Sequence, residues 1–183
     1  MWIAFTLLAC TEPETTYTFA DVEQVAFTTS EGDFVLEVDA TMAAENQHNF
    51  LVYVEEGFYD GADDDGATLF HRVVADFVVQ GGGFRSDGTK KPTRDRVVNE
   101  SGALNLRGTV AMARSNNPDS ARSQFFVNMV DNPGLDAVSG ADGYTVFGAV
   151  IEGMDTLDAI GALEVDGEDR PLRDVVIESA EIR

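Results

Sequence analysis

The sequence predicts a mainly β fold: a closed eight-stranded antiparallel β-barrel with two α-helices that cover its open ends. Three observations lead to this prediction. About eight short apolar or alternating stretches are separated by turns rich in Gly, Asn and Pro. Only two stretches have helical spacing, so the regularly alternating helices that a parallel sheet requires are missing. Eight antiparallel strands are enough to close a barrel whose interior is filled by side chains.

The first two strands are predicted to form a hairpin. Residues 22–29 and 32–39 both alternate in character. Phe34, Leu36 and Val38 share one face of the second strand, and acidic residues occupy the other face. The connecting residues Ser-Glu-Gly-Asp are typical of a tight turn.

Two stretches are predicted to be amphipathic helices, at residues 41–57 and 154–163. In each of them apolar residues recur three or four positions apart, which places them on one stripe. These residues are Phe50, Leu51 and Val54 in the first helix, and Met154, Leu157 and Ile160 in the second.

The other strands are shorter, and turn-forming residues bound each of them. They are expected at about 68–74, 77–80, 109–113, 124–129, 144–150 and 174–182. Before them, the segment DGADDDGA at 60–67 is predicted to be an acidic surface loop. No internal repeat and no second domain are evident, so we expect one domain with a single core. The expected state is a monomer.

The chain is strongly acidic, with a formal net charge of −21 over 183 residues. This charge repels DNA, RNA and anionic lipid, so no nucleic acid is expected as a partner. The basic residues are concentrated, because residues 72–122 hold nine of the twelve Lys and Arg against five acidic residues. Within them, the segment RSDGTKKPTRDR at 85–96 either steers acidic peptides or is an ordinary solvated loop.

The apolar amino terminus, MWIAFTLLAC, is too short for a membrane span and fits the apolar region of a secretory signal better. Its end, LLAC, resembles the bacterial lipobox, so residues 1–10 are predicted to be a lipoprotein signal that ends at a lipidated Cys10. Residues 11–21 would then be a flexible tether to a domain at 22–183, located in the periplasm or on the cell surface. The alternative is a frayed apolar start of a cytoplasmic protein. Cys10 is the only cysteine and only two histidines are present, so neither a disulfide nor a metal site is expected.

Three blocks of the sequence resemble the cyclophilins, the cyclosporin-binding class of peptidyl-prolyl cis-trans isomerase. They are FHRVVADFVVQGGGF at 70–84, GTVAMARSNNPDSARSQFFVN at 108–128 and GYTVFGAVIEGMDTLDAI at 143–160. The resemblance implies a cyclophilin-like barrel capped by two helices, closest to the bacterial type. It also implies an isomerase that assists protein folding, acts on proline-containing peptides and unfolded proteins, and needs no cofactor.

The resemblance also implies roles for particular residues. Arg72 would be the catalytic hydrogen-bond donor to the prolyl nitrogen, rather than a surface arginine. His71 would be structural. The wall around the proline would be formed by Phe77, Val78, Phe126 and Leu135. Two polar residues, Gln80 and Gln124, would bind the peptide main chain and position the arginine. The edge of the site would be formed by Ala113, Arg114 and Tyr144. From spacing alone, the apolar members of this set would be ordinary barrel core.

The chain departs from many cyclophilins at two positions. Gly134 stands where many members have a tryptophan that helps to bind cyclosporin, so weak binding of the drug is expected. Tyr144 stands where many have a histidine. The competing function is a peptide-binding or chaperone module in which isomerisation is incidental, and a more distant alternative is a barrel that acts as a surface scaffold.

Overall fold

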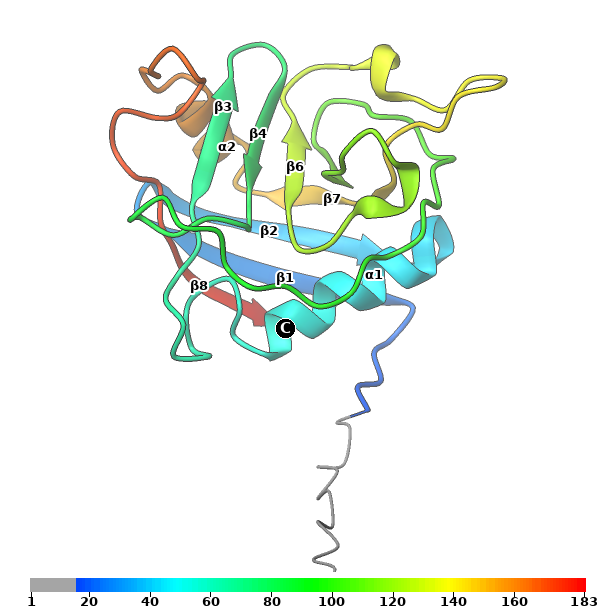
Figure 1. Cartoon of the computed structure of the whole chain (residues 1–183), viewed down its shortest axis with the longest axis horizontal. Coiled ribbons are helices and arrows are strands. Elements are labelled where there is room, and N and C mark those ends of the chain that lie inside the picture. Colours follow the sequence, from blue (N-terminus) through cyan, green and yellow to red (C-terminus); the bar gives the residue numbers. More distant parts are fainter. Residues whose placement is uncertain (1–15) are drawn as a thin grey trace, which may run out of the picture.

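The computed structural model describes residues 16–183, and the predicted signal with Cys10 lies outside the described residues. Eight strands form one sheet in the order β3-β4-β6-β5-β7-β2-β1-β8, and each neighbouring pair is antiparallel (Figure 1). The strands are β1 (Val22–Thr29), β2 (Gly32–Asp39), β3 (Phe70–Val74), β4 (Val78–Gly81), β5 (Thr109–Met112), β6 (Phe125–Asn128), β7 (Val146–Glu152) and β8 (Ile177–Ile182). The predicted mainly β fold of eight antiparallel strands is therefore confirmed.

The sheet is curled, but the predicted closed barrel is not confirmed. Its two edge strands, β3 and β8, approach each other at one bridge, between Leu69 and Val176. No ladder pairs β3 with β8 within residues 16–183. Beyond the bridge each strand bonds to a loop instead: Val73 donates its N–H to the Asp169 carbonyl (2.8 Å), and Ala180 donates to the Asp60 carboxylate (3.2 Å). The bridge is antiparallel and lies just before both strands, so the same register continued would pair β3 with residues before Val176 and β8 with residues before Leu69, and not β3 with β8.

The first two strands pair as the alternation predicts. Their register runs from Val22 opposite Asp39 to Thr29 opposite Gly32. It places Phe27 against Phe34, whose rings stack with centroids 4.9 Å apart in the buried core. Stacked aromatic pairs of this kind add to the stabilisation that burial alone provides.

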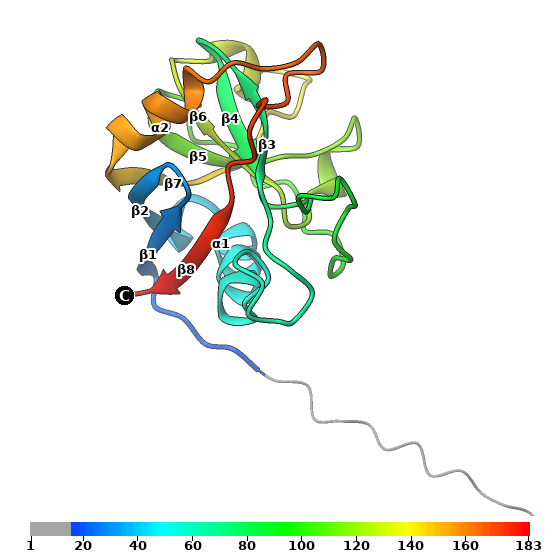
Figure 2. The same cartoon turned by 90° about the vertical axis from the view of Figure 1, so that its left-hand side faces the viewer.

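Two helices cover the sheet, α1 (Ala40–Glu55) and α2 (Met154–Gly161). Helix α1 packs against β2, β7 and β8, whereas α2 packs against β2, β3 and β4. Figures 1 and 2 show them at opposite ends of the curled sheet. The apolar stripe predicted for α1 is buried, and the Asp39 carboxylate caps the helix by accepting a hydrogen bond from the Thr41 N–H (2.7 Å).

The acidic loop closes around a buried lysine that the sequence did not reveal. Lys91 is 2% exposed. Its ammonium donates to the carbonyls of Phe58 (2.7 Å) and Gly66 (2.8 Å) and to the Asp63 carboxylate (2.7 Å). The ammonium also lies 4.6 Å from the centre of the Phe58 ring. One cation therefore links both ends of the loop.

The chain before β1 contacts the outside of α1. The Gln47 amide donates to the carbonyls of Ala20 (3.1 Å) and Asp21 (3.2 Å). The Phe19 ring meets the His48 ring edge-on at 5.4 Å. Among residues 16–183, the helices are too short or too polar to span a bilayer.

Candidate active site

Arg72 lies on β3 directly opposite Gln80 on β4. Its side chain is 38% exposed, and one guanidinium nitrogen is 3.3 Å from the Asp169 carboxylate. Because both partners are largely open to solvent, this ion pair contributes at most about 1 kcal/mol to stability. The arginine therefore remains available to a ligand.

A cavity of about 200 Å³ opens beside Arg72. Nine of the ten residues predicted to act on or bind a peptide line it: Arg72, Phe77, Val78, Gln80, Ala113, Arg114, Phe126, Leu135 and Tyr144. The tenth, Gln124, accepts a hydrogen bond at 2.9 Å from the Gln80 amide. The structure thus brings all ten together from four separate segments of the chain.

The alternation of the strands explains why this apolar wall is not ordinary core. Val79, Phe125 and Val127 point into the main core. Their chain neighbours Val78 and Phe126 point the other way and form a second, smaller apolar cluster. Successive side chains on a strand alternate between faces, so the same short strands supply both the core and the cavity wall.

Tyr144 and Arg114 form one side of the cavity. The Arg114 guanidinium lies 4.5 Å from the centre of the Tyr144 ring and donates to the Asp142 carbonyl (2.7 Å). The Tyr144 ring packs edge-on against Phe126 at 5.6 Å, and its N–H donates to the Leu135 carbonyl (2.8 Å). These contacts hold Tyr144 in a loop, which is why β7 begins at Val146 and not at the predicted residue 144.

Burial keeps the His71 ring neutral. Desolvation lowers the pKa of His71 from 6.5 to about 4, although a hydrogen bond with the Leu69 main chain opposes the shift. The ring lies 4.6 Å from that of Phe84. A neutral ring at pH 7 is consistent with the structural role predicted for this histidine.

Lowering the pH from about 7 to about 5 is expected to reduce the free energy of unfolding by about 1–2 kcal/mol more in the native chain than in a His71→Gln variant. The unfolded histidine gains a proton below its ordinary pKa of 6.5, whereas the folded ring resists protonation down to about 4. Its stabilising effect is therefore complete above about 6.5 and is lost as the pH falls toward about 4. Urea denaturation at both pH values measures the difference. Equal losses in the two proteins would contradict a ring held neutral by folding.

Sequence reasoning missed a second, larger cavity of about 490 Å³ that adjoins the first. The two share Gln80, Ala113 and Arg114. The residues that line only the second are Lys90, Thr93, Arg96, Ser115, Ser120, Arg122, Ser123 and Gln124. Only the concentration of basic residues in 72–122 hinted at it. Within residues 16–183, no cluster of three or more His, Cys, Asp or Glu side chains is suited to a metal ion.

Comparison with known proteins identifies the family. The family model described as cyclophilin type peptidyl-prolyl cis-trans isomerase/CLD matches residues 24–182. The chain belongs to the cyclophilins. Peptidyl-prolyl cis-trans isomerase A of Dickeya dadantii is 41% identical to this cyclophilin, over 97% of this chain and 93% of that protein. Peptidyl-prolyl cis-trans isomerase cyp18 of Streptomyces antibioticus is 45% identical, over 86% of this chain and 97% of that protein.

Solved structures share the cyclophilin fold. A cyclophilin type peptidyl-prolyl cis-trans isomerase of Cryptosporidium parvum matches with a TM-score of 0.73 at 24% identity, over 88% of this chain and 98% of that one. A second structure of that protein, in the presence of the dipeptide Ala-Pro, matches with a TM-score of 0.72 at 24% identity, over 87% of this chain and 98% of that one. At this level of identity the match supports the fold.

Proposed function

We propose that this cyclophilin accelerates rotation about X-Pro bonds in peptides and unfolded proteins, and that Arg72 is the donor that stabilises the twisted bond. The observation that carries the proposal is the position of Arg72 beside the apolar wall of Phe77, Val78 and Phe126 in one cavity. A proline ring suits such a wall, and the adjacent prolyl nitrogen would then lie within reach of the guanidinium.

The chemistry requires neither a covalent intermediate nor a proton transfer. Amide resonance creates a barrier of about 18–20 kcal/mol to rotation. In the twisted state the prolyl nitrogen loses conjugation and gains a lone pair. A donor aimed at this lone pair acts only on the twisted state, which is the condition for raising turnover. A hydrogen bond from a charged donor supplies about 1.5–3 kcal/mol of this stabilisation.

The surrounding residues prepare the site for this step. Phe126 and Val78 are nearly fully buried and fix the wall, so the cavity excludes water from the proline and strengthens the electrostatic effect of the arginine. Gln80 lies opposite Arg72 and donates its amide to Gln124 (2.9 Å). This pair forms a polar border on which a peptide main chain would bind.

A protease-coupled assay on an Ala-Pro peptide tests the proposal. We expect turnover well above the uncatalysed rate, which has a time constant of tens to hundreds of seconds. Peptide binding without acceleration would overturn it and favour the alternative, a peptide-binding module. Gly134 is the observation that favours this alternative, because it puts no side chain next to the wall residue Leu135, and a side chain added there would meet no atom within 4 Å.

Replacing Gly134 with tryptophan is expected to raise the affinity for cyclosporin about tenfold or more, which corresponds to roughly 1.4 kcal/mol per tenfold. Gly134 lies in the 3₁₀ turn Pro133–Leu135 next to the wall residue Leu135. The open space at its Cα accommodates a large ring, which supplies apolar contact area and an N–H donor. Tryptophan fluorescence or calorimetric titration measures the affinity.

Gly134→Ala is the matched control for this substitution. It changes the backbone freedom in the same way but adds no ring, so its affinity for cyclosporin should equal that of the native chain. An unchanged affinity in Gly134→Trp would show that other parts of the wall limit drug binding.

A further inference from the structure

The second cavity gathers positive charge in a chain that is otherwise acidic. Seven of the twelve basic residues form an ion pair with a carboxylate. The five that have no carboxylate partner among residues 16–183 are Lys90, Arg96, Arg114, Arg122 and Arg183. Four of these five line the same cavity, and no acidic residue lines it. Cations without an ion-pair partner in the described part of the chain are therefore concentrated in this one cavity.

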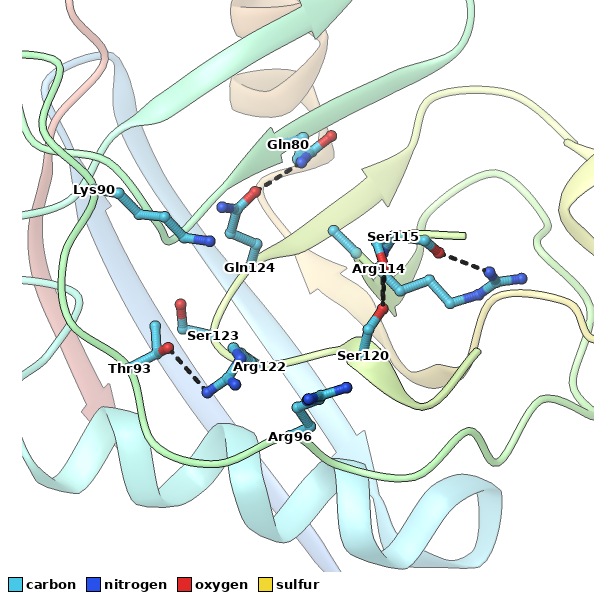
Figure 3. A pocket seen from close by; sticks show the side chains of 11 residues that line it. Gln80, Lys90, Thr93, Arg96, Arg114, Ser115, Ser120, Arg122, Ser123 and Gln124 are labelled. Atoms are coloured by element: carbon cyan, nitrogen blue, oxygen red, sulfur yellow. Dashed lines mark hydrogen bonds between the residues drawn. The ribbon is translucent and has the colours of Figure 1, made fainter. Parts of the chain in front are cut away.

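Figure 3 shows how these side chains surround the cavity. Lys90 and Arg96 come from the loop between β4 and β5, and Arg122 comes from the segment before β6. Arg122 bonds to the Thr93 hydroxyl (3.4 Å) and to the Arg94 carbonyl, so it bridges the two segments. Arg114 lies at the border with the proline cavity, and its guanidinium is occupied by backbone carbonyls and Tyr144.

A buried hydroxyl provides an independent sign of a ligand. Ser123 is 1% exposed and lines the cavity. Its Oγ has no hydrogen-bond partner in the structure, although buried polar groups are nearly always paired. Figure 3 shows the side chain between Lys90 and Arg122. A carboxylate that entered the cavity would be an acceptor for this hydroxyl as well as for the cations.

The position of the cavity indicates which kind of anion it accepts. It shares Gln80, Ala113 and Arg114 with the proline cavity, so one extended peptide can occupy both. An extended chain advances about 3.3–3.6 Å per residue, so a side chain within a few residues of the proline can reach the adjoining basic cavity. Polyanions such as nucleic acids are disfavoured by the net charge of −21.

We propose that the cavity lined by Lys90, Arg96, Arg122 and Ser123 binds an Asp or Glu side chain of the substrate, so that the enzyme prefers X-Pro bonds with an acidic residue close by. This inference rests on the proposed function and names its substrate class. It also refines the steering role considered for residues 85–96. Arg85, Lys91 and Arg94 pair with acidic residues elsewhere, and Lys90 and Arg96 are the only basic residues of that segment that line the cavity.

The test compares peptides that differ only by Glu or Gln at each position within three residues of the proline, on both sides. At low salt, we expect one position at which Glu raises kcat/KM about tenfold over Gln, and a Lys peptide at that position to be poorer than either. At about 0.5 M salt the preference should shrink to about threefold or less, because screening weakens interactions of partly exposed charges.

A double variant, Lys90→Gln with Arg96→Gln, separates the cavity from the overall charge. Both side chains are exposed, so the fold should persist, and the melting temperature verifies this. We expect the Glu preference to fall below about twofold while turnover of the Gln peptide is retained. Arg173→Gln with Arg183→Gln removes the same charge away from the cavity and should keep the preference.

The possible failures are distinguishable. A Glu-to-Gln ratio near one at every position overturns the inference, even if the Gln peptide is turned over rapidly. An equal loss of preference in both double variants also overturns it, because the effect then comes from overall charge. If no peptide is turned over, the proposed function fails, and the ratio of binding affinities for the Glu and Gln peptides decides the inference by itself.

Discussion

Replacing Arg72 with alanine is expected to lower kcat/KM for an Ala-Pro peptide about a hundredfold, the effect of removing one preorganised donor from a transition state. The loss should fall mainly on kcat and leave KM within about twofold, because the guanidinium interacts with the lone pair that forms only in the twisted state. The protease-coupled assay at several peptide concentrations separates the two constants. A rise in KM at unchanged kcat would make Arg72 a binding residue and not a catalytic one.

Three variants show whether the donor itself matters. Arg72→Lys keeps the charge but loses the planar fork, so its activity should lie between those of the native chain and Arg72→Ala. Asp169→Asn weakens the exposed ion pair at 3.3 Å and should change kcat/KM less than about threefold. Arg173→Ala removes a distant exposed arginine and should have no effect. Comparable losses in Asp169→Asn and Arg72→Ala would mean that the carboxylate positions the arginine.

The local elements could be predicted because their signals lie in adjacent residues. The alternation of 32–39 and the apolar stripe of α1 both correspond to the observed elements. The candidate site could be predicted because the cyclophilin resemblance rests on motifs that contain all of its residues except Leu135. Spacing alone would have assigned Val78 and Phe126 to the core. Only their place on the opposite face from Val79 distinguishes them.

The features that escaped prediction depend on contacts between distant segments. Closure of the barrel depends on how residues near Leu69 meet those near Val176, more than one hundred positions later. The basic cavity needs the loop with Lys90 and Arg96 to pack beside the segment with Arg122. Neither contact leaves a periodic signal in the sequence, so both had to be observed.

Replacing Lys91 with methionine is expected to lower the free energy of unfolding by about 2–4 kcal/mol. Breaking a fully buried ion pair by removing one partner costs about 3–5 kcal/mol. The loss is smaller here because Asp63 is 24% exposed, so water can hydrate its carboxylate once the lysine is gone. The carbonyls of Phe58 and Gly66 also lose their donor. Methionine preserves the length of the side chain, so the substitution tests the ammonium and not the volume. The melting temperature should fall by about 5–15 °C at this chain length.

The neighbouring Lys90→Met is the matched control, because Lys90 is exposed and substitutions of such surface residues usually stay within about 0.5 kcal/mol. A loss below about 0.5 kcal/mol in Lys91→Met as well would show that the acidic loop is held without its cation.

If Lys91→Met lowers the free energy of unfolding as expected, the substitution should also change substrate specificity. The buried ammonium anchors Lys91 to the acidic loop, and this residue precedes Arg96 and follows Lys90 along the cavity, so losing the ammonium should loosen the chain that carries both. Loosening it should weaken the preference for acidic peptides more than the turnover of neutral ones, since Arg72 lies on a separate hairpin.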